Sequence, residues 1–295
     1  MTSQLTWSDG ELSDARWLID RALQEDLHGQ PDPTTTSLIV SETMAKVAIG
    51  SRAHGRLAGL PVVRLVLDAL SADADVTAFK HDGELVVPGD VIASLNGPLG
   101  LLLVAERTIL NFLIHLSGIA TVTSQYVDLV KGTKAVLLDT RKTLPAYRTL
   151  AKYAVRCGGG TNHRMGLYDG ILIKDNHLAG WRQQNPTGSL ADAIHEARRR
   201  QPGMKIEVEV DTLTQLADVL QARPEIVLLD NMTLDELRQA ITMRDQFAPG
   251  LLLEASGGVN LKTVQSIAQT GVDRISVGAL THSAPALDLG FDWSI

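Results

Sequence analysis

Residues 139–177 read DTRKTLPAYRTLAKYAVRCGGGTNHRMGLYDGILIKDNH and are rich in positive charge. Seven lysines and arginines stand against three acids there, a local charge of +4, whereas the whole chain carries −7. Nucleic-acid binders are usually basic over a whole face. A cationic segment in an anionic chain instead favours a site for an anionic small molecule.

Length and composition place the chain among ordinary globular proteins. Its 295 residues allow one large domain or two average ones, with 44% apolar and 21% charged residues. Aromatic residues make up only 4%, which argues against stacking platforms for single-stranded nucleic acid. The single cysteine, Cys157, excludes an internal disulfide framework.

The sequence predicts a cytoplasmic protein. Its first residues are polar and acidic, without the apolar core of a secretion signal. The longest relevant apolar run, Leu99–Ala105, is too short to span a bilayer. We therefore expect neither export nor a membrane.

The first hundred residues predict an α/β sandwich. Hydrophobic spacing indicates helices at 11–27 and 60–71, with a polar loop at 28–37. Strands are expected at 45–58, 75–80, 84–87 and 90–95. Residues 99–131 are mostly helical, with a predicted break between two helices at Ser117-Gly118.

After residue 132, short apolar runs alternate with amphipathic helices, which predicts a parallel sheet. Strands are expected at 135–139, 171–174, 205–210, 225–230, 251–256 and 274–279. Helices are expected at 143–156, 189–201, 212–222, 233–245 and 260–270. Polar residues follow almost every strand, which favours a closed or nearly closed α/β barrel, where all carboxyl ends meet at one mouth. An open doubly wound sheet is the alternative.

Four cations, Arg141, Lys142, Arg164 and Lys174, lie at two strand ends and predict an anion site. Guanidinium groups suit carboxylates and phosphates because two parallel hydrogen bonds match a planar anion. Ordinary surface charge or ion pairing is the plainer interpretation.

Glu209 and Asp230 end two neighbouring strands. One carboxylate from each of two strands is a common arrangement for Mg²⁺, although a buried hydrogen-bonded pair, or partners for the four cations, fits the same pattern equally well. The sequence lacks HExxH and paired-cysteine spacings, which argues against zinc.

Glycine turns follow the last two strands, at 256–258 and 277–279. Such turns allow backbone N–H groups to approach a phosphate, and late strands of barrels often carry a phosphate site. The Cys157–Gly160 run has neither a Walker pattern nor a dinucleotide fingerprint. His163 and His177 either donate to an anion or serve as structural hydrogen-bonding groups.

Several long motifs together resemble the quinolinate phosphoribosyltransferase family. They are ERTILNFLIHLSGIAT, DTRKT, KYAVRCGGGTNHRMGLYDGILIKDNH, EVEV, LLDNM, EASGGV and ISVGALTHSAPALD. Their order and spacing match from about residue 100 to 288. Leu144 and Ala146-Tyr147 depart from the family pattern, which affects the detail of a lid.

The resemblance implies transfer of a phosphoribosyl group from phosphoribosyl pyrophosphate to quinolinate with decarboxylation. The products are nicotinate mononucleotide, pyrophosphate and carbon dioxide, a step of NAD biosynthesis. It implies an open-faced α/β sandwich over 1–116 and an incomplete, seven-stranded α/β barrel over 117–283, with the tail 284–295 returning to the sandwich. It also implies Mg²⁺ and a homodimer, alone or in a higher assembly, in which Arg107 reaches the neighbouring site.

The same resemblance assigns roles to residues of this chain. Quinolinate carboxylates are assigned to Arg141, His163, Arg164 and Lys174, with Arg107 from the neighbour. Lys142 faces pyrophosphate or ribose, beside Thr140, and Glu209 and Asp230 hold Mg²⁺ and ribose hydroxyls. The 5′-phosphate is assigned to Ser256, Gly257, Gly258, Val277, Gly278 and Ala279. The expected catalytic residues are Lys142, Lys174, Glu209 and Asp230.

Three other functions fit parts of the sequence. A related phosphoribosyltransferase-like protein, of the kind associated with molybdenum transport, would use another acceptor. A Schiff-base aldolase would use Lys174, which stands at a barrel strand end. A scaffold without enzymatic activity would bind phosphate alone.

Overall fold

The computed structural model describes residues 5–294 and divides them into two compact units. The first contains the described residues up to 124, together with 143–159 and those from 280 onward. The second contains 125–142 and 160–279.

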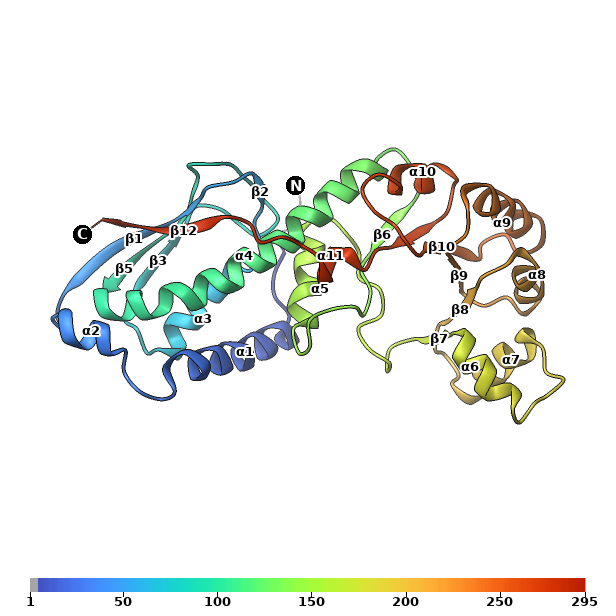
Figure 1. Cartoon of the computed structure of the whole chain (residues 1–295), viewed down its shortest axis with the longest axis horizontal. Coiled ribbons are helices and arrows are strands. Elements are labelled where there is room, and N and C mark those ends of the chain that lie inside the picture. The colour runs from blue at the N-terminus through green and yellow to red at the C-terminus, as the bar shows by residue number, and fades with distance from the viewer. Residues whose placement is uncertain (1–4, 295) are drawn as a thin grey trace. The chain divides into compact units, whose positions relative to one another are not determined.

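The first unit is built on an antiparallel sheet with strand order β12-β1-β5-β3 (Figure 1). Its strands are β1 (Met44–Ser51), β3 (Asp75–Ala78), β5 (Val91–Pro98) and β12 (Leu289–Ser294), and a small ribbon joins β2 (Gly55–Arg56) to β4 (Leu85–Val86). Its helices are α1 (Asp9–Leu27), α2 (Pro33–Leu38), α3 (Pro61–Ala69), α5 (Arg148–Cys157) and most of α4 (Leu99–Val130).

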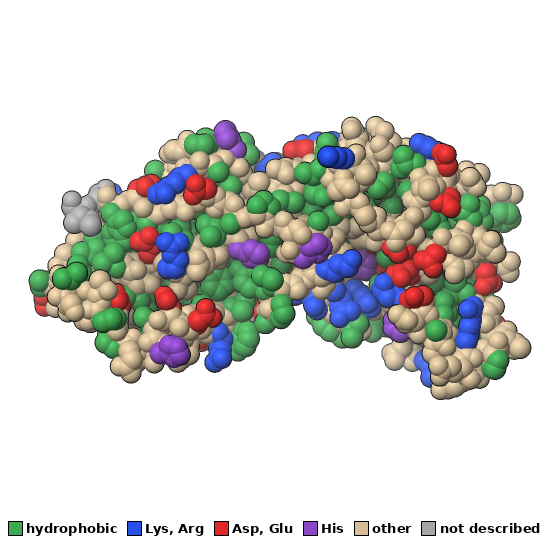
Figure 2. Space-filling view, in the orientation of Figure 1, with side chains coloured by type: hydrophobic (Ala, Val, Ile, Leu, Met, Phe, Trp, Pro, Cys, Tyr) green, Lys and Arg blue, Asp and Glu red, His purple; other side chains and the backbone are tan. Residues whose placement is uncertain are grey.

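Alternation of burial along β1 explains the open-faced sandwich. Ala45, Val47 and Ile49 are buried, whereas Met44 and Lys46 are exposed. Successive side chains of a strand point to opposite faces, so one face of this sheet packs on helices and the other remains accessible. Large apolar side chains are also exposed near α2, including Leu38 and Val40, and Figure 2 shows hydrophobic side chains on the surface of this unit.

The loop predicted at 28–37 is wrong in its second half, because α2 begins at Pro33. The Asp32 carboxylate accepts hydrogen bonds from the backbone N–H groups of Thr34 and Thr35, both at 3.0 Å. An aspartate N-cap followed by proline at the first helical position is a strong start signal for a helix. The two prolines therefore flank a helix start rather than a continuous loop.

The predicted break at Ser117-Gly118 is also wrong, because α4 continues through it for 32 residues. Gly118 has a packing role: a Cβ atom there would collide with the carbonyl oxygen of Pro285, and the backbone carbon of Pro285 would be 3.0 Å away. The Ser117 hydroxyl accepts a hydrogen bond from Ala58 N at 3.0 Å. Because both residues are small, the backbone of Pro285 can contact α4 at Gly118 and the backbone of Ala58 can contact it at Ser117.

We expected no membrane-spanning segment, because the apolar run at 99–105 is short. The uninterrupted helix α4 is longer than that run. By length and composition α4 could cross a bilayer, with a mean hydropathy of 1.6 over its most apolar 18-residue window. Half of that window is buried inside the protein. Core helices of water-soluble proteins pass the same test, so the helix is weak evidence for a membrane span.

The second unit contains a parallel sheet with strand order β6-β11-β10-β9-β8-β7. Its strands are β6 (Val136–Leu138), β7 (Ile171–Ile173), β8 (Ile206–Val210), β9 (Ile226–Asp230), β10 (Leu252–Ser256) and β11 (Arg274–Ser276). Between them run α6 (Asp175–Arg182), α7 (Leu190–Arg200), α8 (Leu213–Ala222), α9 (Leu234–Phe247) and α10 (Val264–Gln269). The short α11 (Ala279–His282) follows β11 and belongs, except for Ala279, to the first unit.

The predicted α/β architecture is confirmed, with one correction to the strand count. Six strands are regular, and the seventh position is taken by a single parallel bridge between Thr161 and Leu138. The barrel is therefore incomplete, with Thr161 beside β6 at one edge and β7 at the other. The helix α6 was not predicted, whereas α7, α8 and α9 each begin at a capping box, headed by Ser189, Thr212 and Thr233.

The helix predicted at 143–156 begins only at Arg148 and belongs to the first unit. Pro145 and the left-handed Ala146, with φ of 62°, delay its start. Its Tyr153 hydroxyl donates to the half-buried Asp82 carboxylate at 2.6 Å, and Arg156 pairs with Glu11 at 2.5 Å. These contacts explain why α5 belongs to the sandwich unit. The predicted domain boundary between residues 116 and 117 stays a prediction.

Two glycines in helices predict opposite responses to alanine. Gly118→Ala should lower the free energy of unfolding by about 1–3 kcal/mol, because the clash with Pro285 outweighs the helix propensity of alanine. Gly180 in α6 has open space around it, so Gly180→Ala should raise stability by roughly 0.5–1 kcal/mol. Urea denaturation of both variants tests this, and a stabilising Gly118→Ala would contradict the packing role.

Candidate functional site

Polar side chains of the second unit share one face of the parallel sheet. Glu209 of β8 and Glu254 of β10 are both in register with Leu228 of β9, and Arg274 of β11 is in register with Glu254. Residues two apart on a strand point to the same face. The site face is therefore formed by Glu207, Glu209, Asp230, Glu254, Ser256 and Arg274.

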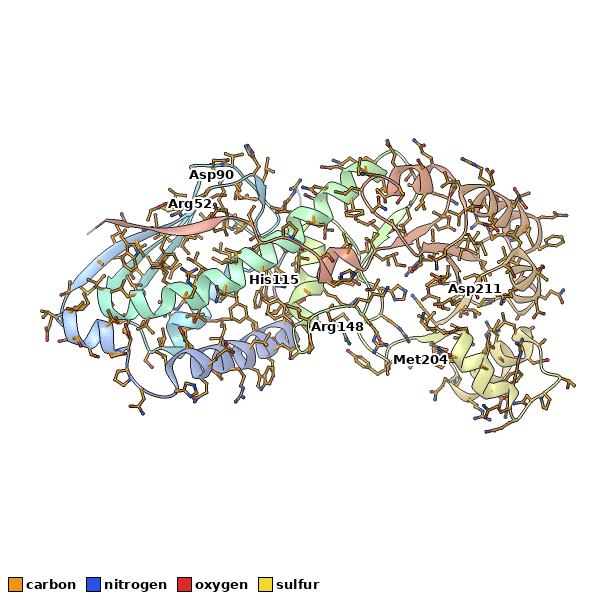
Figure 3. All side chains as sticks on the ribbon, in the orientation of Figure 1. Arg52, Asp90, His115, Arg148, Met204 and Asp211 are labelled. Atoms are coloured by element: carbon orange, nitrogen blue, oxygen red, sulfur yellow. The ribbon has the colours of Figure 1, made fainter. Side chains whose placement is uncertain are left out.

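The opposite face of these strands is apolar. In β8, the apolar residues Ile206, Val208 and Val210 alternate with the two glutamates along the strand and are fully buried. A strand with apolar residues on one face and acids on the other packs its apolar face under helices. The acids therefore line the inner side of the incomplete barrel. Met204 and Asp211 mark the two ends of β8 in Figure 3.

Lys174 and Glu209 form an ion pair between the ends of neighbouring strands. The lysine side chain is 42% exposed and the glutamate side chain 14%. This pair lies at the carboxyl ends of the strands, where a barrel has its mouth. Two residues expected to bind different ligands are thus partners of each other.

The turn after β10 packs closely on Asn231. Gly257, with φ of 92°, leaves no room for a side chain, because a Cβ atom would collide with the side chain of Asn231. Asn231 in turn donates from its side chain to Asp230 at 2.7 Å and from its backbone to the Ser256 carbonyl at 2.9 Å. Gly258 has open space beside it, so its backbone is accessible.

The segment that follows Thr161 is held by a buried aspartate. Asp139 is fully buried directly after β6 and accepts hydrogen bonds from Asn162 Nδ2 at 2.6 Å and from His163 N at 2.9 Å. The guanidinium of Arg164 donates to the Gly170 carbonyl at 2.8 Å. These bonds give an irregular segment a defined backbone path.

The His163 ring points to the acids of the sheet. Its Nε2 lies 3.0 Å from Glu207 Oε2 and 3.4 Å from Glu254 Oε1, and its side chain is 10% exposed. Its Nδ1 accepts the backbone N–H of Arg164 at 2.7 Å. Both ring nitrogens are therefore engaged within the protein.

Burial and the neighbouring charges shift the pKa values of this cluster in opposite directions. Burial favours the neutral ring of His163, whereas the hydrogen bonds and charges of Glu207 and Glu254 raise its pKa above the ordinary value. Burial also raises the pKa of Glu207, whereas His163 and Arg274 hold the pKa of Glu254 below its usual range against the effect of burial. The Arg164 amide favours the neutral ring, because protonation at Nδ1 would cost its hydrogen bond.

His163, Glu207 and Glu254 also have the residue types of a metal site, with ligand atoms within 4.8 Å of one another. The hydrogen bond from Arg164 to Nδ1 leaves the proton of a neutral ring on Nε2, and a protonated ring carries one there as well. Nε2 then has no lone pair for a cation. Arg274, which donates to Glu254 at 2.8 Å, supplies positive charge instead.

The predicted site residues fall on both units. Thr140, Arg141, Lys142, His163, Arg164, Lys174, Glu209, Asp230, Ser256, Gly257, Gly258, Val277, Gly278 and Ala279 belong to the second unit. Arg107 belongs to the first, on the exposed side of α4. Burial and the charge of Arg141 lower the pKa of Arg164.

Sequence reasoning placed Asp139 and Glu254 at strand ends but gave neither a role, and it missed Glu207 and Arg274. Glu207, Glu254 and Arg274 stand two residues before Glu209, Ser256 and Ser276. Residues two apart on a strand point to the same face, so the predicted strands already placed Glu207, Glu254 and Arg274 on the face of Glu209, Ser256 and Ser276.

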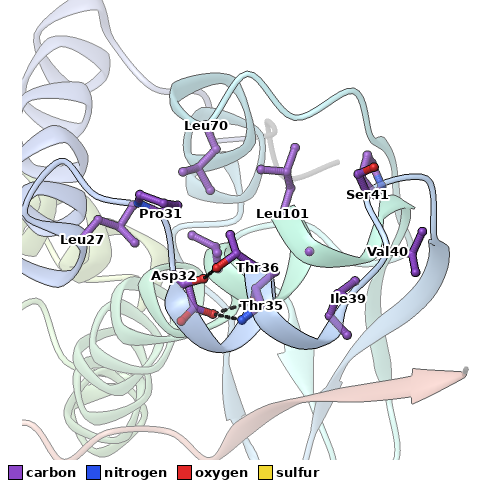
Figure 4. A pocket seen from close by; sticks show the side chains of 13 residues that line it. Leu27, Pro31, Asp32, Thr35, Thr36, Ile39, Val40, Ser41, Leu70 and Leu101 are labelled. Carbon is purple, nitrogen blue, oxygen red and sulfur yellow. Dashed lines mark hydrogen bonds between the residues drawn. The ribbon is translucent and has the colours of Figure 1, made fainter.

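A second candidate is an apolar groove of about 600 Å³ in the first unit, beside α2 (Figure 4). Leu27, Ile39, Leu70 and Leu101 contribute to its wall. Its acid, Asp32, is occupied with capping α2. The groove thus offers apolar surface and little reactive chemistry.

Comparison with known proteins shows the family of this chain. A model of the quinolinate phosphoribosyl transferase N-terminal domain matches residues 32–117, and a model of the C-terminal domain matches 119–292. The chain belongs to the quinolinate phosphoribosyltransferase family. The family matches thus cover both units and nearly the whole chain.

Curated members of the family are similar over their full length. Nicotinate-nucleotide pyrophosphorylase [carboxylating] of Mycobacterium leprae is 46% identical over 97% of this chain and 99% of its own. A probable enzyme of the same name from Bacillus subtilis is 38% identical over 93% and 92%. The solved nicotinate-nucleotide pyrophosphorylase of Francisella tularensis, 35% identical, covers both chains completely with a TM-score of 0.89.

Proposed function

We propose that this protein transfers the phosphoribosyl group of phosphoribosyl pyrophosphate to the ring nitrogen of quinolinate, in the cytoplasm. Decarboxylation then gives nicotinate mononucleotide, with pyrophosphate and carbon dioxide as the other products. The observation that carries this proposal is the clustering of site residues, far apart in sequence, in one unit of a chain of this family.

The cations suit a dicarboxylate. Burial and the charge of Arg141 both lower the pKa of Arg164, so the positive charges of the two arginines repel each other. Two neighbouring guanidinium groups leave an excess of positive charge that a dianion relieves. We assign the quinolinate carboxylates to these arginines and to Lys174. Lys142, whose backbone N–H donates to Thr140 Oγ1 at 3.0 Å, is assigned to pyrophosphate or ribose.

Glu209 and Asp230 fit Mg²⁺ by their chemistry. Both are carboxylates on the same face of adjacent strands at the mouth of the barrel, and neither is fully buried. Mg²⁺ prefers such oxygen ligands and keeps several waters. When bound, it would neutralise charge that develops on the leaving pyrophosphate. We further assign ribose hydroxyls to these two acids.

The glycine turns suit the 5′-phosphate. Gly258 has open space beside it, and Val277 is fixed by donating its N–H to the Leu138 carbonyl at 2.9 Å. A fixed turn with accessible backbone N–H groups binds phosphate without conformational cost. We therefore assign Ser256–Gly258 and Val277–Ala279 to this group.

The residues act by binding, orientation and charge. Breaking the C1′–O bond develops positive charge on ribose and negative charge on pyrophosphate, which fixed cations stabilise. The ribosylated ring nitrogen is cationic and accepts the electrons released by decarboxylation. No covalent intermediate is required, and Lys174, ion-paired with Glu209, has a role without Schiff-base chemistry.

Product analysis tests the proposed function. Incubation with quinolinate, phosphoribosyl pyrophosphate and Mg²⁺ should give nicotinate mononucleotide by mass and one equivalent of carbon dioxide. Nicotinate should not replace quinolinate as acceptor. Turnover of nicotinate, or turnover without carbon dioxide release, would contradict the proposal.

The Lys174–Glu209 ion pair predicts an unusual binding response. Quinolinate must draw Lys174 away from Glu209, so Glu209→Gln should tighten quinolinate binding by about two- to fivefold. Calorimetric titration without phosphoribosyl pyrophosphate or metal measures this directly.

A double-mutant cycle supplies the control for this effect. In a Lys174→Ala background, Glu209→Gln should leave quinolinate affinity nearly unchanged. Asp230→Asn removes a similar charge that pairs with Asn231 instead, and should tighten binding less. Equal tightening in all three comparisons would indicate a general charge effect and refute the exchange of partners.

We also propose a homodimer in which Arg107 serves the neighbouring site. Leu103 and Arg107 are both exposed on α4, and residues four apart lie on one side of a helix. Exposed Leu38 and Val40 and the apolar groove add hydrophobic surface to the same unit. Apolar surface of this kind supports self-association.

Complementation tests the shared site. Arg107→Ala and Lys174→Ala should each be inactive alone, whereas purified heterodimers of the two should recover about half of wild-type activity, since one of two sites is then intact. Absence of recovery in verified heterodimers would show that Arg107 acts within its own chain or not at all.

A further inference from the structure

The position of Arg164 depends on a segment without regular structure. Residues 162–170 form neither helix nor strand between Thr161 and β7. Loops are the more mobile parts of a fold, whereas an arginine that selects a planar dianion needs a fixed location. Something outside the segment must therefore fix its backbone.

The His163 ring supplies that connection. It accepts the Arg164 N–H through Nδ1 at 2.7 Å and donates through Nε2 to Glu207 at 3.0 Å. Glu254, 3.4 Å from Nε2, is itself held by Arg274 at 2.8 Å. A hydrogen-bonded path thus runs from β8 to the backbone of Arg164, and the Glu254 carboxylate of β10 lies beside it as a charged contact.

Stability alone does not explain two acids in this interior. Glu207 is 4% exposed and Glu254 fully buried, and within residues 5–294 one oxygen of each lacks a hydrogen-bond partner. Burying carboxylates costs several kcal/mol even in ion pairs, and apolar replacements are often as stable. Their retention in a barrel interior points to a functional role.

We propose that Glu207 and Glu254 are positioning residues for the acceptor. They orient the His163 ring, and the ring fixes the backbone of Arg164, so that its guanidinium is placed for a quinolinate carboxylate. This inference rests on the proposed function and deepens it. It gives His163 a positioning role through Arg164 in addition to its assignment to a quinolinate carboxylate.

Substitutions at Glu207 separate the possible roles. Glu207→Leu removes the acceptor for Nε2 and should weaken quinolinate binding by about tenfold or more, with phosphoribosyl pyrophosphate affinity changed less than about twofold. Glu207→Gln keeps an oxygen that accepts from Nε2–H and should stay within about threefold of wild type. Both affinities are measured by calorimetry.

Asp273→Asn is the matched control. Asp273 is a partly buried acid of the same unit, paired with Arg244 and Lys134 at 2.7 Å each, without a bond to His163. It should leave quinolinate affinity unchanged even where it lowers stability. Equal loss of both substrates in Glu207→Leu, or loss of quinolinate binding in Asp273→Asn, would overturn the positioning role.

If Glu207→Leu does not fold, nitrogen NMR of the histidines in the wild-type protein tests the inference, because it shows which ring nitrogen of His163 carries the proton. In wild-type protein, the His163 signals should show a proton on Nε2 and an unprotonated, hydrogen-bonded Nδ1. A proton on Nδ1 would break the link to Arg164 and refute the inference. Wild-type turnover of quinolinate, measured in parallel, distinguishes failure of this inference from failure of the proposed function.

Discussion

The register of the parallel sheet is the constraint on which the candidate site depends. It sets Glu209 and Glu254 beside the same residue of β9 and aligns Ser256 with Asp230. Because side chains alternate between faces, fixing one polar residue of a strand fixes its neighbour two positions away. A shift by one residue would turn the acids toward the helices and the valines toward the mouth. The apolar residues of β8 oppose such a shift, so packing of the helices and placement of the site have a common origin.

The sequence predicted the fold of the second unit well because its signals are local. The strand at 206–210 alternates apolar and acidic residues, the strand at 226–230 is an apolar run that ends in Asp230, and the helices after them begin at capping residues such as Thr212 and Thr233. The positions that carry Lys174, Glu209 and Asp230 follow from the same runs. Prediction of a shared mouth required only the rule that parallel strands end on one side.

The errors arose where distant parts of the chain decide the structure. Gly118 has the local character of a helix break, yet it accommodates the backbone of Pro285, more than 160 residues later. The cluster of His163 with Glu207 and Glu254 likewise depends on an irregular segment meeting two strands, and spacing along the chain does not reveal such a meeting. The helix α2 is a different case, since its Asp-Pro start was visible in the sequence but was outweighed by neighbouring prolines.

The pairing of β12 with β1 has a consequence for biosynthesis. Residues 289–294 complete the sheet of the first unit by lying against 46–51, although the entire parallel sheet is translated between them. On the ribosome, β1 therefore waits with an open edge until the final strand has left the exit tunnel. An unpaired edge invites wrong partners. The portion of the polypeptide made first is thus finished last, and chaperones have most to protect during that interval.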